Sequence, residues 1–91
     1  LSTADPLTGL GNRRAFDEAL AVELARARRT GAPATLVMID LDRFKRLNDR
    51  HGHAMGDAVL REVGGVLLAG LRRVDVACRY GGEELMVLMP D

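Results

Sequence analysis

The first apolar pattern in the chain has helical spacing. Phe16, Leu20 and Leu24 are four residues apart, so residues 13–29 are predicted to form an amphipathic helix with Asn12 as its N-cap. Turn-forming residues lie on both sides of this segment: Pro6, Gly9, Gly11, Gly31 and Pro33.

Two more helical patterns follow, over residues 42–50 and from about residue 55 to residue 72, separated by Gly52. Gly64 and Gly65 weaken the later helix and are interpreted as points of close packing. Five apolar residues are predicted to form its buried stripe: Val59, Val63, Val66, Leu67 and Leu71.

Three strands are predicted. Residues 34–40 (ATLVMID) are a short apolar run typical of a buried strand, and residues 74–80 alternate as a strand does. Residues 84–90 form another apolar run. Gly81 and Gly82 join the last two strands, and we expect a tight hairpin that uses the glycines' tolerance of positive φ.

The order helix, strand, helix, helix, strand, strand favours an α+β fold with a ferredoxin-like sheet flanked by helices. In such a sheet the last strand inserts beside the first, so the end of 34–40 lies next to the start of 84–90. This arrangement brings four acidic residues to one edge of the sheet: Asp40, Asp42, Glu83 and Glu84.

Converging carboxylates repel one another unless a cation lies among them, and hard oxygen ligands suit Mg²⁺ or Mn²⁺. The spacing alone is equally consistent with acids that cap a helix and solvate a hairpin tip. The helix after Asp42 adds free backbone N–H groups near Arg43 and Phe44, and Lys45 adds a positive charge. A metal site beside a phosphate cradle indicates phosphoryl or nucleotidyl transfer.

The composition limits the remaining classes. With 91 residues the chain forms one small domain, and 13 basic against 13 acidic residues give no general attraction to nucleic acid. Cys78 is the only cysteine, so an internal disulfide is excluded and a reducing compartment is expected. No apolar run approaches the length of a membrane helix, and no signal peptide is visible.

Three blocks then resemble one family: DPLTGLGNRR (5–14), DLDRFKRLNDRHGHAMGD (40–57) and RYGGEEL (79–85). Together they resemble the GGDEF family, the diguanylate cyclases, with GGEEL as the signature and Leu85 where phenylalanine is usual. The resemblance implies a nucleotidyl-cyclase palm of which residues 1–91 are the first half to three-fifths, incomplete at the C-terminus. Residues 1–11 would be an N-terminal turn and hinge, and residues 12–91 the first part of the palm.

The resemblance also implies a reaction and its residues. Two GTP molecules, one per subunit of a homodimer, would be joined into cyclic di-GMP with release of pyrophosphate. Two Mg²⁺ or Mn²⁺ ions per half-site would be held by Asp40, the Leu41 carbonyl, Glu83 and Glu84. Glu84 would activate the 3′-hydroxyl and, with Lys45, form the catalytic group.

Further residues match binding sites of the family. Asn48 and Asp57 would read guanine, and the backbone of Arg43 and Phe44 with the Lys45 side chain would hold the terminal phosphates. The alternatives for Asn48 and Asp57 are a solvent-facing helix residue and a helix-start residue, and Asp42 is read equally as an N-cap or a ligand. His53 is interpreted as a structural turn residue.

The RRVD stretch contains Arg72 and Asp75, which match the family's inhibitory product site; the alternative is a solvated helix end. Asp5, Arg13 and Arg14 would fix the hinge to an upstream sensor or receiver domain through ion pairs.

The expected location is cytoplasmic, in a protein that could carry a membrane anchor elsewhere. The alternative function is a non-catalytic module that binds GTP or cyclic di-GMP. Residues 1–91 alone are expected to be inactive.

Overall fold

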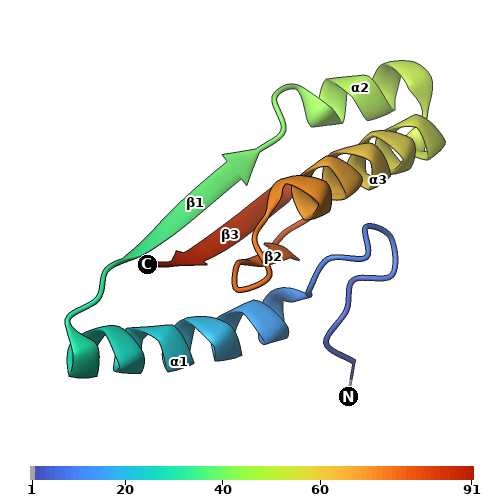
Figure 1. Ribbon diagram of the computed structural model, residues 1–91. Helices are drawn as coiled ribbons and strands as arrows, with labels where there is room; N and C mark the ends of the chain where they lie inside the picture. The colour runs from blue at the N-terminus through green and yellow to red at the C-terminus, as the bar shows by residue number, and fades with distance from the viewer. Residues whose placement is uncertain (1) are drawn as a thin grey trace.

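The computed structural model describes residues 2–91. Over this range an N-terminal turn segment leads into three helices and three strands (Figure 1). Their order along the chain is α1 (Arg13–Thr30), β1 (Ala34–Asp40), α2 (Phe44–His51), α3 (His53–Gly70), β2 (Val76–Arg79) and β3 (Glu84–Pro90). The α+β class and the type of every predicted element are therefore confirmed, with shifts of a few residues at the ends of α2, α3 and β2.

The sheet has the strand order β1-β3-β2, and both pairs are antiparallel. β3 therefore inserts beside β1, as the ferredoxin-like arrangement predicts. The register pairs Asp40 with Glu84 at one end of the β1–β3 ladder and Ala34 with Pro90 at the other. The end of β1 and the start of β3 thus form a single edge of the sheet.

The central strand carries the core. Leu85, Met86, Val87 and Leu88 are all buried, because β3 has a neighbour on both sides and its two faces are covered. α1 packs on one face, where Phe16 contacts a cluster of Cys78, Met86 and Leu88. Leu85 and Val87 alternate with these residues along β3 and are also buried, so the opposite face of the strand is covered as well.

β1 is not the buried strand that its apolar sequence predicts. It lies at the edge of the described sheet, and α1 packs on β2 and β3 instead. Leu36 is 44% exposed and Met38 is 73% exposed as a result. Leu24, predicted in the apolar stripe of α1, is likewise exposed, at 48%.

The buried side of α3 also differs from the predicted stripe. It is formed by Gly56, Leu60 and Gly64, whereas Val66 is 67% exposed. Gly64 packs on the N-terminal turn segment, where an added Cβ would lie 3.1 Å from the Thr8 carbonyl oxygen. Close packing is thus confirmed at Gly64; Gly65, in contrast, faces open space.

Two loops place the helices and the hairpin. Gly52 alone separates α2 from α3, with φ 91° and ψ 160°, values that only glycine adopts readily. Gly81 and Gly82 do not use positive φ, contrary to the prediction. Instead, the absence of a Cβ at Gly81 makes room for the Glu84 side chain, whose Oε1 would lie 2.6 Å from such a Cβ.

The N-terminal turn segment closes the outer edge of β2. The Gly11 N–H donates to the Ala77 carbonyl at 3.1 Å, and the Arg79 N–H donates to the Gly11 carbonyl at 2.9 Å. Asn12 caps α1 by accepting from the Ala15 N–H, as predicted. No helix in the described part of the chain is long and apolar enough to cross a membrane.

Candidate active-site cleft

A cleft of about 490 Å³ opens where the C-terminal end of β1, the hairpin before β3, and helices α2 and α3 meet. It is lined by residues from each of the three predicted groups: the acidic residues, the phosphate-binding residues and the guanine-binding residues. The lining residues are Asp40, Phe44, Lys45, Asn48, Asp49, His53, Asp57, Leu60, Arg79, Gly82, Glu83 and Glu84. The structure thus gathers seven predicted site residues from distant parts of the sequence.

Three carboxylates enter the cleft from the sheet edge. Asp40 and Glu84 are direct cross-strand partners and therefore lie on the same face of the sheet. Glu83 precedes Glu84 on the hairpin, and its backbone carbonyl accepts a hydrogen bond from the Leu41 N–H at 3.2 Å. Within residues 2–91, none of the three carboxylates forms an ion pair.

This donor set fits a hard divalent cation, because unpaired carboxylates on one cleft are otherwise left to repel one another. The side chains are not gathered at one point, however: across the described residues no three acidic, histidine or cysteine side chains form a metal-sized group. Asp40 and Glu84 are exposed, so their side chains are free to change rotamer.

The loop between β1 and α2 has an unusual backbone. Arg43 is the N-cap residue of α2, and its φ of 58° and ψ of 28° are left-handed. No side chain caps the helix, so the N-cap alternative for Asp42 is wrong. The first backbone N–H groups of a helix have no intrahelical acceptor, which leaves those of Arg43, Phe44 and Lys45 available to an anion.

Asn48 and Asp57 reach the cleft from α2 and α3. The Asn48 Oδ1 atom is buried and, among residues 2–91, has no hydrogen-bond partner. The amide lies against Gly56, where the missing side chain leaves space for it. Asn48 is therefore not a solvent-facing helix residue, and Asp57 is not a helix-start residue because α3 begins at His53.

Arg79 is a cleft residue that sequence reasoning did not assign. Its Nε and a terminal nitrogen donate to the Gly82 carbonyl at 3.2 and 2.9 Å, which fixes the hairpin backbone before Glu83. A second terminal nitrogen lies 3.6 Å from the Asp5 carboxylate. The sequence signal that could have indicated this role is the position of Arg79, two residues before the glycine pair.

Asp49 and His53 also line the cleft. His53 begins α3 and was expected to serve only the turn.

Three predicted positions of the loop between β1 and α2 lie outside this cleft. Asp42 and Arg43 line a separate cavity of about 270 Å³ on α2, together with Arg46 and Arg50. Asp42 therefore does not join the other acids, because the chain turns at Arg43 before α2 begins. Leu41 is not among the cleft-lining residues.

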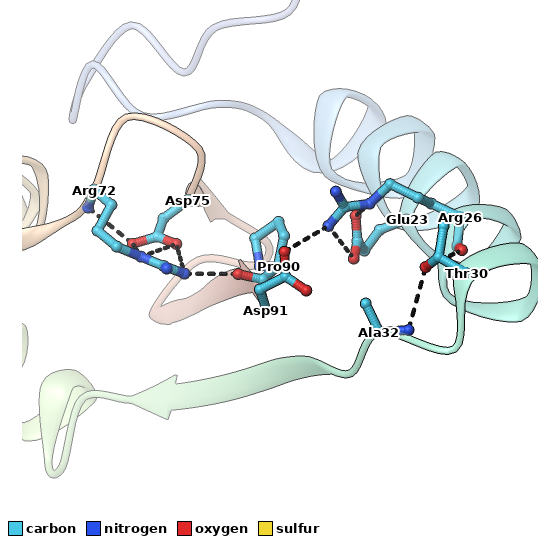
Figure 2. A network of polar contacts seen from close by, with 8 residues as sticks. All are labelled: Glu23, Arg26, Thr30, Ala32, Arg72, Asp75, Pro90 and Asp91. Carbon is cyan, nitrogen blue, oxygen red and sulfur yellow. Dashed lines mark hydrogen bonds and ion pairs between the residues drawn. The ribbon is translucent and has the colours of Figure 1, made fainter.

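Arg72 and Asp75 lie at the other end of β3 and contact each other (Figure 2). The guanidinium is 2.8 Å from Asp75 Oδ1 and donates to the Pro90 carbonyl at 2.7 Å. The Asp75 side chain is only 1% exposed. Hydrogen bonds from Arg72 lower the pKa of Asp75, and the same pair raises the pKa of Arg72. Asp75 is therefore not a solvated helix-end residue, whereas the Arg72 side chain is 51% exposed.

Figure 2 also shows how the end of β3 is tied to α1. Arg26 forms two hydrogen bonds of 3.0 Å with the buried carboxylate of Glu23 and lies 3.8 Å from Asp91. The polar contacts around Pro90 and Asp91 thus hold the strand end from two sides.

The hinge residues have mixed contacts. Asp5 accepts from the Thr8 N–H and hydroxyl and pairs with Arg79. Arg13 instead lies over the Tyr80 ring, 4.4 Å from its centroid, and Arg14 donates to the Ser2 carbonyl. Of the three residues expected to form ion pairs, only Asp5 does so in the described part of the chain.

Comparison with known proteins gives one consistent result. The family model for the diguanylate cyclase GGDEF domain matches residues 2–91. The chain is 50% identical over 86 residues to the diguanylate cyclase DgcP of Pseudomonas aeruginosa, covering 94% of this chain and 13% of that protein. It is 47% identical over 91 residues to the response regulator PleD of Caulobacter vibrioides, covering 100% and 20%.

Among solved structures, the chain is similar to the GGDEF domain of DgcB from Caulobacter crescentus in complex with c-di-GMP. The TM-score is 0.93 at 42% identity, over 97% of this chain and 50% of that one. The chain therefore spans about half of a solved domain, and between 13% and 20% of the two curated relatives.

Proposed function

Because the chain belongs to the GGDEF family, we propose that it forms the first part of a diguanylate cyclase domain. The domain would join two GTP molecules into cyclic di-GMP and release two pyrophosphates. The observation that carries this proposal is the single cleft that gathers carboxylates, a helix start with Lys45, and the pair Asn48 and Asp57.

Guanine recognition is assigned to Asn48 and Asp57. The N1–H and N2 amino groups of guanine donate to a carboxylate, which Asp57 supplies, and an amide can answer O6 or N7. Adenine has no N2 amino group, so a carboxylate here favours GTP over ATP. The burial of the Asn48 Oδ1 atom supports this role, because a fixed amide discriminates better than a mobile one.

The phosphates are assigned to the start of α2. The backbone N–H groups of Arg43 and Phe44 and the ammonium group of Lys45 would bind the terminal phosphates. Asp40, the Leu41 carbonyl, Glu83 and Glu84 would hold two Mg²⁺ or Mn²⁺ ions, which when bound supply charge neutralisation to the phosphates.

In the reaction, the 3′-hydroxyl oxygen of one GTP forms a bond to the α-phosphorus of the other, and the bond from that phosphorus to pyrophosphate breaks. Glu84 would accept the hydroxyl proton, and Lys45 would stabilise the negative charge on the phosphates. Each GTP would be bound by one subunit of a homodimer.

The product site and partners complete the proposal. Arg72 and Asp75 would bind cyclic di-GMP as inhibitor, since arginine forks onto phosphate and stacks on guanine. Similarity to a response regulator supports an upstream receiver or sensor domain, joined through the hinge that contains Asp5. We place the domain in the cytoplasm, where GTP is available.

A non-catalytic module that binds GTP or cyclic di-GMP is the second candidate. One observation favours it: in residues 2–91 the acids are not gathered into a metal-sized group. To separate the two, the full-length protein is incubated with GTP and Mg²⁺, with ATP as the matched control, and the products are identified by mass spectrometry. Cyclic di-GMP from GTP alone supports the enzyme; bound but unchanged GTP supports the module.

Residues 1–91 alone are proposed to make no cyclic di-GMP. They span about half of the solved DgcB domain, and β1 has a free edge in the described sheet. An exposed edge with Leu36 and Met38 invites pairing with another chain, so the isolated segment is expected to associate. Efficient GTP cyclisation by a verified chain of this length would refute this.

A further inference from the structure

Gly56 lies one residue before Asp57, and the Asn48 side chain rests directly on its backbone. A Cβ at this position would overlap Asn48 Oδ1 and would lie 2.8 Å from Cγ and 3.1 Å from Nδ2. Gly56 is buried inside α3 and has no positive φ, so its backbone conformation is open to any residue. The glycine is required for the space it leaves, not for its flexibility.

The Asn48 amide is held there by packing and not by hydrogen bonds. Its Oδ1 atom is buried and has no hydrogen-bond partner within residues 2–91. A buried acceptor without a donor costs free energy, so the surrounding packing must hold the amide in this position. The turn between the helices is fixed by the Gly52 N–H, which donates to the Asn48 carbonyl at 2.7 Å. With Oδ1 against Gly56, the Nδ2 donors are the part of the amide left for a ligand in the cleft.

We propose that Gly56 is a positioning residue for nucleotide specificity: it fixes the Asn48 amide so that its donors face the base. This inference rests on the proposed function, in which Asn48 reads guanine. Gly56 contacts no substrate in this scheme and acts only through Asn48. Its effect is therefore expected on the choice of base more than on the chemical step.

The same helix provides a matched control. Gly65 also lies in α3, but a Cβ there would have no neighbour within 4 Å. A change to alanine raises helix propensity equally at both positions. Any difference between the two variants thus reports the contact with Asn48 and not the general effect of replacing a helical glycine.

The experiment compares Gly56→Ala, Gly65→Ala, Asn48→Ala and the double variant Asn48→Ala/Gly56→Ala in the full-length protein. KM and kcat are measured for GTP, and binding is measured for GTP and ATP. Gly56→Ala is expected to raise the KM for GTP about tenfold with a smaller change in kcat, and to lower the GTP-over-ATP preference about tenfold. Gly65→Ala should match the wild type.

The double variant provides the decisive test. If Gly56 acts through the amide, Gly56→Ala should have no further effect once Asn48 is alanine, and the double variant should melt higher than Gly56→Ala alone. Independent, multiplying effects on the KM would overturn the proposal, as would wild-type specificity in Gly56→Ala. A wild-type protein that binds no GTP would instead refute the proposed function, a result distinguishable because it appears before any substitution.

Discussion

The left-handed backbone of Arg43 allows a quantitative test of the loop that begins α2. Apart from the final residue Asp91, Arg43 is the only non-glycine residue between 2 and 91 with positive φ. For a residue with a Cβ, this conformation costs about 1–2 kcal/mol, and glycine avoids that cost. Glycine also gains entropy in the unfolded chain, which opposes the benefit by about 0.4–1 kcal/mol.

The comparison that isolates the strain is Arg43→Gly against Arg43→Ala. Both variants remove the guanidinium, which is exposed and forms no ion pair in the described residues, but only glycine removes the strain. Taking about 1.5 kcal/mol for the strain and about 0.7 kcal/mol for the entropy leaves Arg43→Gly more stable than Arg43→Ala by about 0.8 kcal/mol. The free energies of unfolding of the two variants are measured in urea, and the comparison is valid when both variants give the same m value.

The same pair of variants tests the phosphate role of this loop. If the left-handed turn presets the backbone N–H groups for phosphate, Arg43→Ala should keep GTP affinity because it keeps the turn. Arg43→Gly should bind GTP a few-fold more weakly, because the more flexible loop must then be ordered when GTP binds. Equal stability of the two variants would show that the turn stores no strain and would refute the reasoning.

Three further predictions concern other parts of the molecule. Asp40→Ala or Glu83→Ala should lower turnover at least about a hundredfold with the fold intact by circular dichroism, because the phosphates lose neutralising charge; near-normal turnover would refute the metal assignment. Arg72→Ala or Asp75→Ala should weaken cyclic di-GMP binding in calorimetry about tenfold or more and leave the initial rate unchanged, and unchanged product affinity would remove the inhibitory role. Burial raises the pKa of the Cys78 thiol to about 11 from an ordinary 9.0, so the unfolded chain loses its proton first. The Cys78 contribution to stability should be constant below about pH 9 and fall by up to about 2–3 kcal/mol toward pH 11, and Cys78→Ala should remove that part of the slope.

The sequence predicted the elements well because their signals are local. The four-residue spacing of α1, the apolar run of β3 and the break at Gly52 all act within a few residues. The sheet order also followed, because an antiparallel last strand beside the first is a standard solution for this element order. The convergence of Asp40 with Glu83 and Glu84 is a direct consequence of that order.

The failures share a physical cause: burial depends on neighbours that a short window does not contain. The apolar run of β1 looks the same whether a helix covers it or not, and its exposure follows from the position of α1. Gly64 and Gly65 are identical in sequence, yet only the first meets Thr8. Positive φ was predicted at Gly81 because glycine tolerates it, but Gly81 has no positive φ. A glycine is needed there because a Cβ would clash with the Glu84 side chain.

The position of β3 explains why inhibition and turnover should separate in the variants above. Its first residue, Glu84, lines the cleft, and its last, Pro90, accepts a hydrogen bond from Arg72. Seven residues of strand place these ends about 20 Å apart, beyond direct contact. The strand between them is buried and paired on both sides, so loss of Arg72 frees the strand end without disturbing the acids. A change in initial rate in Arg72→Ala would therefore mean that β3 transmits the loss along its whole length.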